Sequence, residues 1–383
     1  MILWFAWPRN YILRATLRAT FSRATLRANQ QIRVRYDPQS PEGRKAGKWL
    51  AGGYKGVLFS IGGDLDYFAK WLNLSRWSKE SSPCSLCQCV AKGVLSWHDN
   101  RYPAAPWLKT IWTSDSWNKW PGRSKSPLFT PEWISAANVF YDWMHTKHLG
   151  ADQYIFGSVL WLLVFQVLPA SPIENLGIVW RYIKKYYQVH KFTGTRYRSI
   201  TKLSMFVRKK GFAKLRGKAS EIKHFSGVIL DVWAHFMKAT DEHKAIKLLL
   251  KKTHQLNCIL DNHKVQDGYI ALPERIGNTF IDACFTMAQL QKQLGESFKA
   301  QGIKIFTMTA KTHCMMHTAL LCKAIPPALV WCYQGESFMR VVQRIMQSCV
   351  RGNNPFNAMS KATEHYNLGM QLRYEEESKN QAA

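Results

Sequence analysis

The sequence predicts a mainly α-helical protein with a small β element. Beyond Pro172 the chain carries two long stripes of apolar residues at helical spacing, within residues 246–260 and 280–298, and each is typical of a helix that packs one face against a core. A short segment, residues 57–61, has the apolar run of a buried strand. The 16 Trp and 19 Phe among 383 residues predict a large buried core and argue against disorder.

Local composition and residues that break secondary structure divide the chain into four segments. Residues 1–50 form a basic, low-complexity N-terminal extension, because residues 1–36 contain seven Arg, no acidic residue and a repeated Arg-Ala-Thr unit. Residues 51–125 contain the strand and a Cys-x-x-Cys knuckle, residues 126–368 form a helical basic domain, and residues 369–383 are predicted to be a disordered tail. An Arg-rich start without acids is also typical of an organelle transit peptide, and this alternative stays open.

The strand at residues 57–61 runs into Gly63-Asp64-Leu65-Asp66. It therefore places Asp64 at its end, and Asp66 is the alternative because strand alternation turns both side chains the same way. Asp64 could equally cap a helix that follows. We expect a short helix and loop over residues 67–82, and an irregular, Trp-anchored insertion over residues 95–135.

Two cysteines and two histidines have the spacing of zinc ligands. Cys84 and Cys87 form a Cys-x-x-Cys, with Cys89 beside it, and His313 and His317 lie four residues apart, on one face of a predicted helix. If the two pairs meet, they form a C2H2 zinc site. The alternatives are buried thiols with ordinary helix histidines, or a redox pair, although no thioredoxin-like pattern surrounds the cysteines.

Residues 154–168 are the most apolar run of the chain. A membrane span needs about 20 apolar residues, whereas this run has 15 and contains Gln166. We therefore predict a buried core helix and no membrane contact. Pro169 and Pro172 mark its end.

The chain is strongly basic, with 53 Lys and Arg against 25 Asp and Glu and a formal charge of +28. Such a charge favours a polyanionic partner, and DNA is the partner expected. No acidic residue occurs between Asn175 and Ser220, and aromatic residues are interleaved with the cations, which suits a nucleic-acid track. A solvated basic face or a nuclear-import signal is the alternative. The predicted DNA-binding residues are Lys184, Lys185, Arg196, Arg198, Arg208, Lys209, Lys210, Arg216 and Lys218.

The order of these motifs resembles the catalytic core of DDE-type transposases, especially the CACTA (En/Spm) group. That group has an acidic residue at a strand end, a Cys-x-x-Cys, a segment like Asp142-Trp-Met-His145, a basic stretch, and a Lys-x-His-x-x-x-His followed by a Glu-bearing helix. Here the last parts read Lys311-Thr-His313-Cys-Met-Met-His317 and Gly335-Glu336. The resemblance spans roughly residues 55 to 350.

The resemblance implies a partial RNase H-like core with a large helical insertion. It implies that Asp64 and Glu336 are catalytic carboxylates for Mg²⁺ or Mn²⁺, that Cys84, Cys87, His313 and His317 hold a structural Zn²⁺, and that the partner is DNA, with a possible homo-oligomer and a nuclear location. The resemblance gives no role to Asp142 and His145. Glu336 could instead be a helix N-terminal acid that complements the dipole.

The chain departs from the family at the first catalytic Asp. Asp37 is the one Asp before Asp64, and 27 residues cannot hold the strands that an RNase H-like fold places between them. We therefore expect an N-terminally truncated, degenerate DNA-cutting site. A non-enzymatic zinc-stabilised nucleic-acid-binding protein and, with less support, a membrane-associated basic protein are the alternatives.

Overall fold

The computed structural model describes residues 2–4, 60–76, 78–209, 212–264, 268, 270–350 and 354–382. The described part is mainly helical with one small sheet, so the prediction of a mainly α fold with a small β element is confirmed. The chain divides into two compact units, Met1–Trp331 and Cys332–Ala383. This division falls inside the segment 126–368 that the sequence predicts as one helical domain.

The small sheet has the order β1-β2-β3. Strand β2 (Ser60–Gly63) pairs in parallel with β3 (Val139–Tyr141), and Gly63 faces Tyr141 at the carboxyl end of the pair. Strand β1 (Ile2–Trp4) pairs antiparallel with β2. The predicted strand at residues 57–61 is thus present from Ser60 onward, whereas residues 57–59 and the Arg-rich repeat lie outside the described residues.

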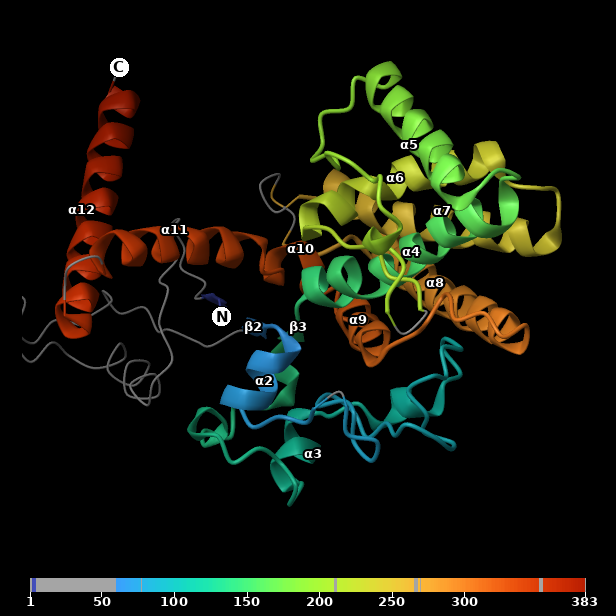
Figure 1. Cartoon of the computed structure of the whole chain (residues 1–383). Helices are drawn as coiled ribbons and strands as arrows, with labels where there is room; N and C mark the ends of the chain where they lie inside the picture. The colour runs from blue at the N-terminus through green and yellow to red at the C-terminus, as the bar shows by residue number, and fades with distance from the viewer. Residues whose placement is uncertain are drawn as a thin grey trace, which may run out of the picture. The chain divides into compact units, whose positions relative to one another are not determined.

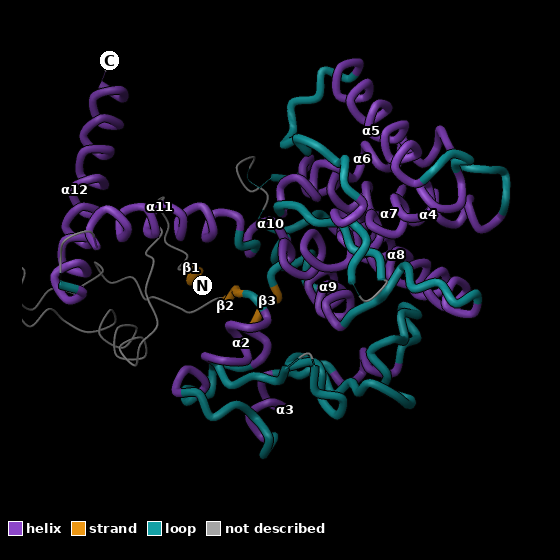
Figure 2. Tube along the Cα trace, viewed as in Figure 1, coloured by secondary structure: helices purple, strands orange, loops and turns teal. Residues whose placement is uncertain are grey.

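Between β2 and β3 the chain is mostly loop, as the teal trace in Figure 2 shows. Helix α2 (Leu65–Trp71) opens the segment, and only short helical pieces follow it: η2 (Pro106–Thr110), α3 (Ser114–Lys119), η3 (Pro127–Phe129) and η4 (Ala136–Asn138). Trp107 and Trp117 are fully buried. The segment is therefore the irregular, Trp-anchored region that the sequence predicts over residues 95–135.

A helical stretch, Met144–Val167, runs through the centre of the first unit and is kinked at Gly150, whose backbone is not helical (Figure 1). It consists of the π-helix η5 (Met144–Ala151), α4 (Asp152–Leu162) and the π-helix η6 (Leu163–Val167). By length and composition this stretch could cross a membrane, but 72% of the apolar window is buried inside the protein. Ile155, Phe156 and Val159 pack into the main core, as predicted for a buried core helix.

The close approach of two segments explains the glycine at position 157. The backbone of Lys214 and Leu215 lies against α4 there, and the amide of Leu215 donates to the carbonyl of Gln153 at 2.8 Å. A Cβ on Gly157 would stand 2.6 Å from the nitrogen of Leu215 and 2.8 Å from Cα of Lys214. These contacts are with backbone, so no side-chain rotation could relieve them.

An ion pair is completely buried at the junction of η5 and α4. The Lys147 ammonium donates to both oxygens of Asp152, at 3.0 and 2.7 Å, and both side chains are 0% exposed. Burial is the largest influence on both groups: it lowers the pKa of Lys147 and raises that of Asp152 to about 6. Each charge is therefore tolerated only because the other is beside it.

Three helices form the next layer of the bundle (Figure 1). Helix α5 (Pro172–Val189) begins after the N-cap Ser171, whose side chain and Glu174 form a capping box, with Pro172 in the first turn. Helices α6 (Ala219–Phe236) and α7 (Asp241–Asn262) pack against each other and against α4. The apolar stripe predicted within residues 246–260 is the buried face of α7.

Helix α8 (Glu274–Ala300) packs on α7 and carries the second predicted stripe on its buried face. Helix α9 (Ala310–Leu320) lies against α8, η5 and β3. The short helix α10 (Pro327–Val330) contributes Val330 to a small apolar cluster with Phe140 of β3 and Ile325. The sheet is therefore attached to the bundle mainly through β3.

The second unit contains α11 (Tyr333–Val350) and α12 (Pro355–Ala382), which pack on each other through Cys349, Ala358 and Ala362. A disordered tail is predicted from residue 369, whereas α12 stays helical to Ala382. The reason is local, because residues 369–382 contain one glycine, no proline and many good helix formers.

Candidate metal centre

The knuckle and the histidine helix, which carry the predicted zinc ligands, meet in the core of the first unit. Cys84, Cys87, His313 and His317 are all buried, and their ligand atoms lie within 4.8 Å of one another. Cys84 Sγ is 3.4 Å from His317 Nε2, Cys87 Sγ is 3.3 Å from His313 Nε2, and the two Nε2 atoms are 3.1 Å apart. The cluster can hold a metal ion.

These distances match the edges of a tetrahedral zinc site. Zinc bonds of about 2.3 Å to sulfur and about 2.0 Å to nitrogen give tetrahedral S···N edges of about 3.5 Å and N···N edges of about 3.3 Å. The measured S···N and N···N distances fall within a few tenths of an ångström of these values. Two thiolates and two imidazoles are also a familiar donor set for zinc.

Helix α9 presents both imidazoles because His313 and His317 are one turn apart, on the face that packs inward. The helix is fixed to the sheet by Thr318, whose hydroxyl donates to the carbonyl of Tyr141 at 2.9 Å. Lys311 at the start of α9 donates to the carbonyl of Leu149 in η5 at 3.2 Å. Contacts at both ends therefore set the position of the histidines.

Tyr141, the last residue of β3, holds the knuckle from the other side. Its hydroxyl accepts from the amide of Ser85 at 2.9 Å and lies 3.5 Å from Cys84 Sγ. Burial is the largest of several influences that raise the pKa of Tyr141 well above its usual value. The phenol therefore keeps its proton and can donate it in a hydrogen bond to a Cys84 thiolate.

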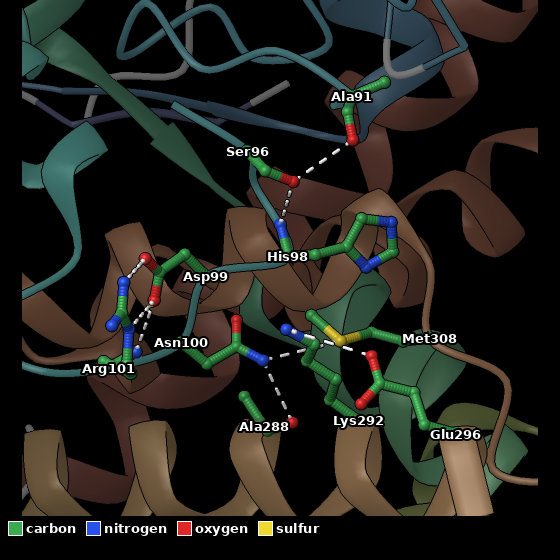
Figure 3. A network of polar contacts seen from close by, with 10 residues as sticks. All are labelled: Ala91, Ser96, His98, Asp99, Asn100, Arg101, Ala288, Lys292, Glu296 and Met308. Atoms are coloured by element: carbon green, nitrogen blue, oxygen red, sulfur yellow. Dashed lines mark hydrogen bonds and ion pairs between the residues drawn. The ribbon is translucent and has the colours of Figure 1, made fainter. Parts of the chain in front are cut away.

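The loop after the knuckle is anchored to α8 and to the segment before α9 (Figure 3). The side-chain amide of Asn100 donates to the carbonyl of Ala288 at 3.1 Å and contacts Met308 Sδ at 3.6 Å. The neighbouring Asp99 binds Arg101 through two side-chain hydrogen bonds, at 2.9 and 2.6 Å. The irregular segment is thus attached to the helical bundle without regular secondary structure.

Trp107 forms an apolar wall of the cluster. Its ring centroid is 4.4 Å from that of His313 and 5.1 Å from that of His317, and its indole nitrogen donates to the carbonyl of Asp99 at 2.7 Å. The sequence does not identify Trp107 as part of the site, because one tryptophan among 16 carries no spacing signal.

Burial favours the metal-binding form of His313 but opposes the metal-binding thiolate form of the cysteines. It lowers the pKa of His313, so that imidazole is neutral. Burial is the largest influence on Cys84 and opposes its ionisation, but hydrogen bonds from Cys87 and Cys89 and the neighbouring imidazoles hold the pKa of Cys84 well below its usual value. Burial raises the pKa of Cys87, so a bound metal would have to displace its proton.

The predicted catalytic Asp64 and the motif residue Asp142 lie at the carboxyl ends of β2 and β3. Asp64 caps α2 by accepting from the amide of Tyr67 at 2.5 Å. Asp142 accepts from the amides of Met144 and His145 at the start of η5 and also binds the His145 ring. Helix capping, the alternative considered for Asp64, is therefore present in the structure.

Asp64 and Asp142 follow residues that are paired across the two strands, Gly63 and Tyr141. Both carboxylates act on Lys311: burial is the largest influence and lowers its pKa, whereas the charges of Cys314, Asp64 and Asp142 oppose that shift. Glu336 belongs to α11 in the second unit, and its catalytic role stays a prediction.

The predicted DNA track extends from α5 to the start of α6. Its cations point outward and its aromatics inward: Tyr187, Tyr197 and Phe206 are buried, and Tyr182, Tyr186 and Phe192 pack on the same core. Within residues 181–209 and 212–218, no lysine or arginine forms an ion pair with a described acid. The exposed predicted residues are Lys184, Lys185, Arg196, Arg198, Lys209, Arg216 and Lys218, while Arg208 is half-buried and Lys210 lies outside the described residues.

Comparison with known proteins assigns no relative, since no family model, curated protein or solved structure matches this chain.

Proposed function

We propose that this chain is a zinc-containing DNA-binding protein of the DDE-transposase type. The observation that carries the proposal is the convergence of Cys84 and Cys87 with His313 and His317 from segments more than 220 residues apart. All four positions of a tetrahedral site are filled by protein donors, which is typical of structural rather than catalytic zinc. A bound zinc supplies a cross-link between the two segments.

The cations support DNA as the partner. The formal charge is +28, and seven of the nine predicted DNA-binding residues are exposed and form no ion pair with a described acid. Lysines and arginines of this kind bind phosphates and release counterions. Because the aromatics of this stretch pack inward, we do not expect them to stack on bases. We expect the cations to bind the sugar–phosphate backbone instead.

The order of motifs supports the transposase type and a partial RNase H-like core. In that reading β2 delivers Asp64 to the carboxyl end of a parallel strand pair, and α9 follows with the Lys-x-His-x-x-x-His motif. Equilibrium binding of the purified chain to duplex DNA, measured over a range of salt concentrations, tests the proposal. Binding with no salt dependence, or no binding at low salt, would contradict it.

Metal-dependent strand cleavage is the second candidate, and the neighbouring positions of Asp64 and Asp142 favour it. Carboxylates that hold Mg²⁺ or Mn²⁺ would activate the attacking oxygen and stabilise the leaving oxygen. The test is nicking of supercoiled plasmid with either metal, comparing the natural chain with Asp64→Asn. Asparagine caps a helix as well as aspartate does, so loss of nicking would report chemistry. DNA binding without nicking would leave the non-enzymatic function.

A further inference from the structure

A third thiol, Cys89, lies beside the four predicted ligands. It is 0% exposed, and its Sγ is 3.4 Å from His313 Nε2. The thiols of both Cys87 and Cys89 interact with that of Cys84. Cys89 therefore contacts His313 and interacts with the thiols of both Cys84 and Cys87.

The backbone explains why Cys89 points into the cluster. Cys87 bridges to Ile111, and the amide of Trp112 donates to the carbonyl of Leu86 at 2.9 Å, so this part of the knuckle runs extended beside residues 110–112. In extended chain, alternate side chains face the same way. Cys87 and Cys89 accordingly point inward, whereas Gln88 between them is exposed.

Cys89 is thus a fifth donor beside the four that could hold a metal ion. Cys84, Cys87 and His313 form a shared triangle, and His317 stands over it through contacts of 3.4 Å to Cys84 and 3.1 Å to His313. Cys89 makes an equally close contact, 3.4 Å, to His313. A tetrahedral ion bound to the triangle can therefore take its fourth ligand from either residue.

The net charge of the metal complex determines whether His317 or Cys89 is the preferred fourth ligand. A divalent ion with two thiolates and two imidazoles is neutral, whereas three thiolates and one imidazole leave a charge of −1. In a fully buried site beside the ring of Trp107, an uncompensated charge is costly. His317 is therefore the preferred fourth ligand, and Cys89 is held in contact as the second choice.

We propose that Cys89 is a reserve ligand, which replaces His317 on a bound Zn²⁺ or a similar thiophilic divalent ion. In the exchange the bond from the metal to His317 Nε2 breaks, the Cys89 thiol loses its proton to solvent, and a metal–sulfur bond forms. No oxidation or reduction is involved. This inference rests on the metal centre of the proposed function, and it adds that the centre has two four-ligand states.

The test loads the full chain with Co²⁺, whose thiolate charge-transfer absorption counts bound thiolates. His317→Leu and His317→Gln remove the imidazole while largely filling its space. We expect at least one of them to keep one Co²⁺ per chain, with charge-transfer absorbance per cobalt rising by about half as two thiolates become three. Cys89→Ser alone leaves the spectrum of the natural chain unchanged, and Cys89→Ser combined with His317→Leu or with His317→Gln loses the metal.

Controls separate this inference from the metal centre itself. Cys258→Ser, which changes a thiol on α7 outside the cluster, leaves metal content and spectrum as they are. Loss of cobalt from both His317 variants, or retention without the added absorbance, would overturn the reserve role while leaving a C2H2 centre. A natural chain that binds neither zinc nor cobalt would overturn both.

Discussion

Cys84 Sγ lies 3.4 Å from His317 Nε2, although 233 residues separate the two in sequence. The chain between them includes the buried stretch Met144–Val167 and helices α5 to α8. A metal at this contact would close a loop around the helical bundle and would fix α9 against the knuckle.

The metal content of the purified protein is the first prediction. We expect about one zinc per chain, and loss of it in Cys84→Ser and in His313→Ala, because both residues belong to the triangle shared by the two ligand sets. Elemental analysis after dialysis measures this. Cys258→Ser serves as the thiol control, and zinc retained by both ligand variants would place the ion elsewhere.

Removing the metal should lower the thermal midpoint. A ligand present at 100 times its Kd adds about 2.7 kcal/mol to the stability of the folded state, and an unfolding entropy of about 2.1 cal/mol/K per residue makes the unit Met1–Trp331 shift by about 1.4 °C per kcal/mol. A strong chelator is therefore expected to lower the midpoint of the natural chain by about 4 °C in calorimetry. The Cys84→Ser chain, already without metal, should melt at one temperature with or without chelator.

Gly157 and Gly177 form a matched pair for backbone packing. Gly157→Ala should destabilise the protein by about 1–3 kcal/mol or more, because its Cβ would meet backbone atoms at 2.6–2.8 Å. On α5, the nearest atom to a Cβ at Gly177 is 3.7 Å away, on a flexible arginine, so Gly177→Ala should stabilise by about 0.5–1 kcal/mol. Denaturant unfolding compares the two, and equal effects would contradict the close approach.

Breaking the buried ion pair should cost more than removing it. Lys147→Met leaves Asp152 buried without a counter-charge, which costs about 3–5 kcal/mol, whereas Lys147→Met with Asp152→Leu should recover most of that loss. Urea unfolding of the three chains measures the difference. A double variant no more stable than Lys147→Met would contradict this, because it would show that the pair stabilises the fold by more than each charge neutralising the other.

The same pair gives a pH dependence. The pKa of Asp152 is raised from 3.8 to about 6 in the folded protein, so the folded state holds this proton more tightly than the unfolded chain. The contribution of this carboxyl group to the free energy of unfolding is then fully present below pH 3.8 and is lost as the pH rises through about 6. Without Lys147 the carboxyl pKa rises further, so the deficit of Lys147→Met should be smaller at pH 5 than at pH 8.

DNA affinity should depend on the cations of α5. Lys184→Ala with Lys185→Ala removes two exposed charges, and each lost phosphate contact reduces the slope of log K against log salt by about 0.9. We expect a slope smaller by about 2, measured by fluorescence anisotropy. Lys247→Ala with Lys251→Ala removes the same charge from exposed positions of α7, and an equal loss there would indicate a general charge effect.

The sequence predicts those parts of the fold and of the candidate site that depend on residue spacing and periodicity. The helical stripes of α7 and α8, the buried stretch around Ile155 and the two ligand pairs all follow from patterns that repeat at 3.6 residues or match known ligand spacing. Helix α9 turns His313 and His317 to one face for the same reason.

Contacts between segments that meet only in the folded structure leave no such pattern in the sequence. The contact between Cys89 and His313 arises because residues 87–89 run extended beside residues 110–112, and nothing local to the sequence fixes that pairing. The sequence does not predict the Lys147–Asp152 pair either, because helical ion pairs usually join residues three or four apart and these two are five apart. For the aromatics of the basic stretch, no sequence pattern separates packing on the core from base stacking, and in the structure they pack on the core.

The order of synthesis gives the distant ligands a further consequence. Cys87 leaves the ribosome 226 residues before His313, which is an interval of about 10–45 s at about 5–20 residues per second. During that time the knuckle thiols exist without their imidazole partners, while the helices between them are still being made. A metal could therefore meet all four ligands only late in biogenesis, and an ion bound earlier would have to be held by the cysteines alone.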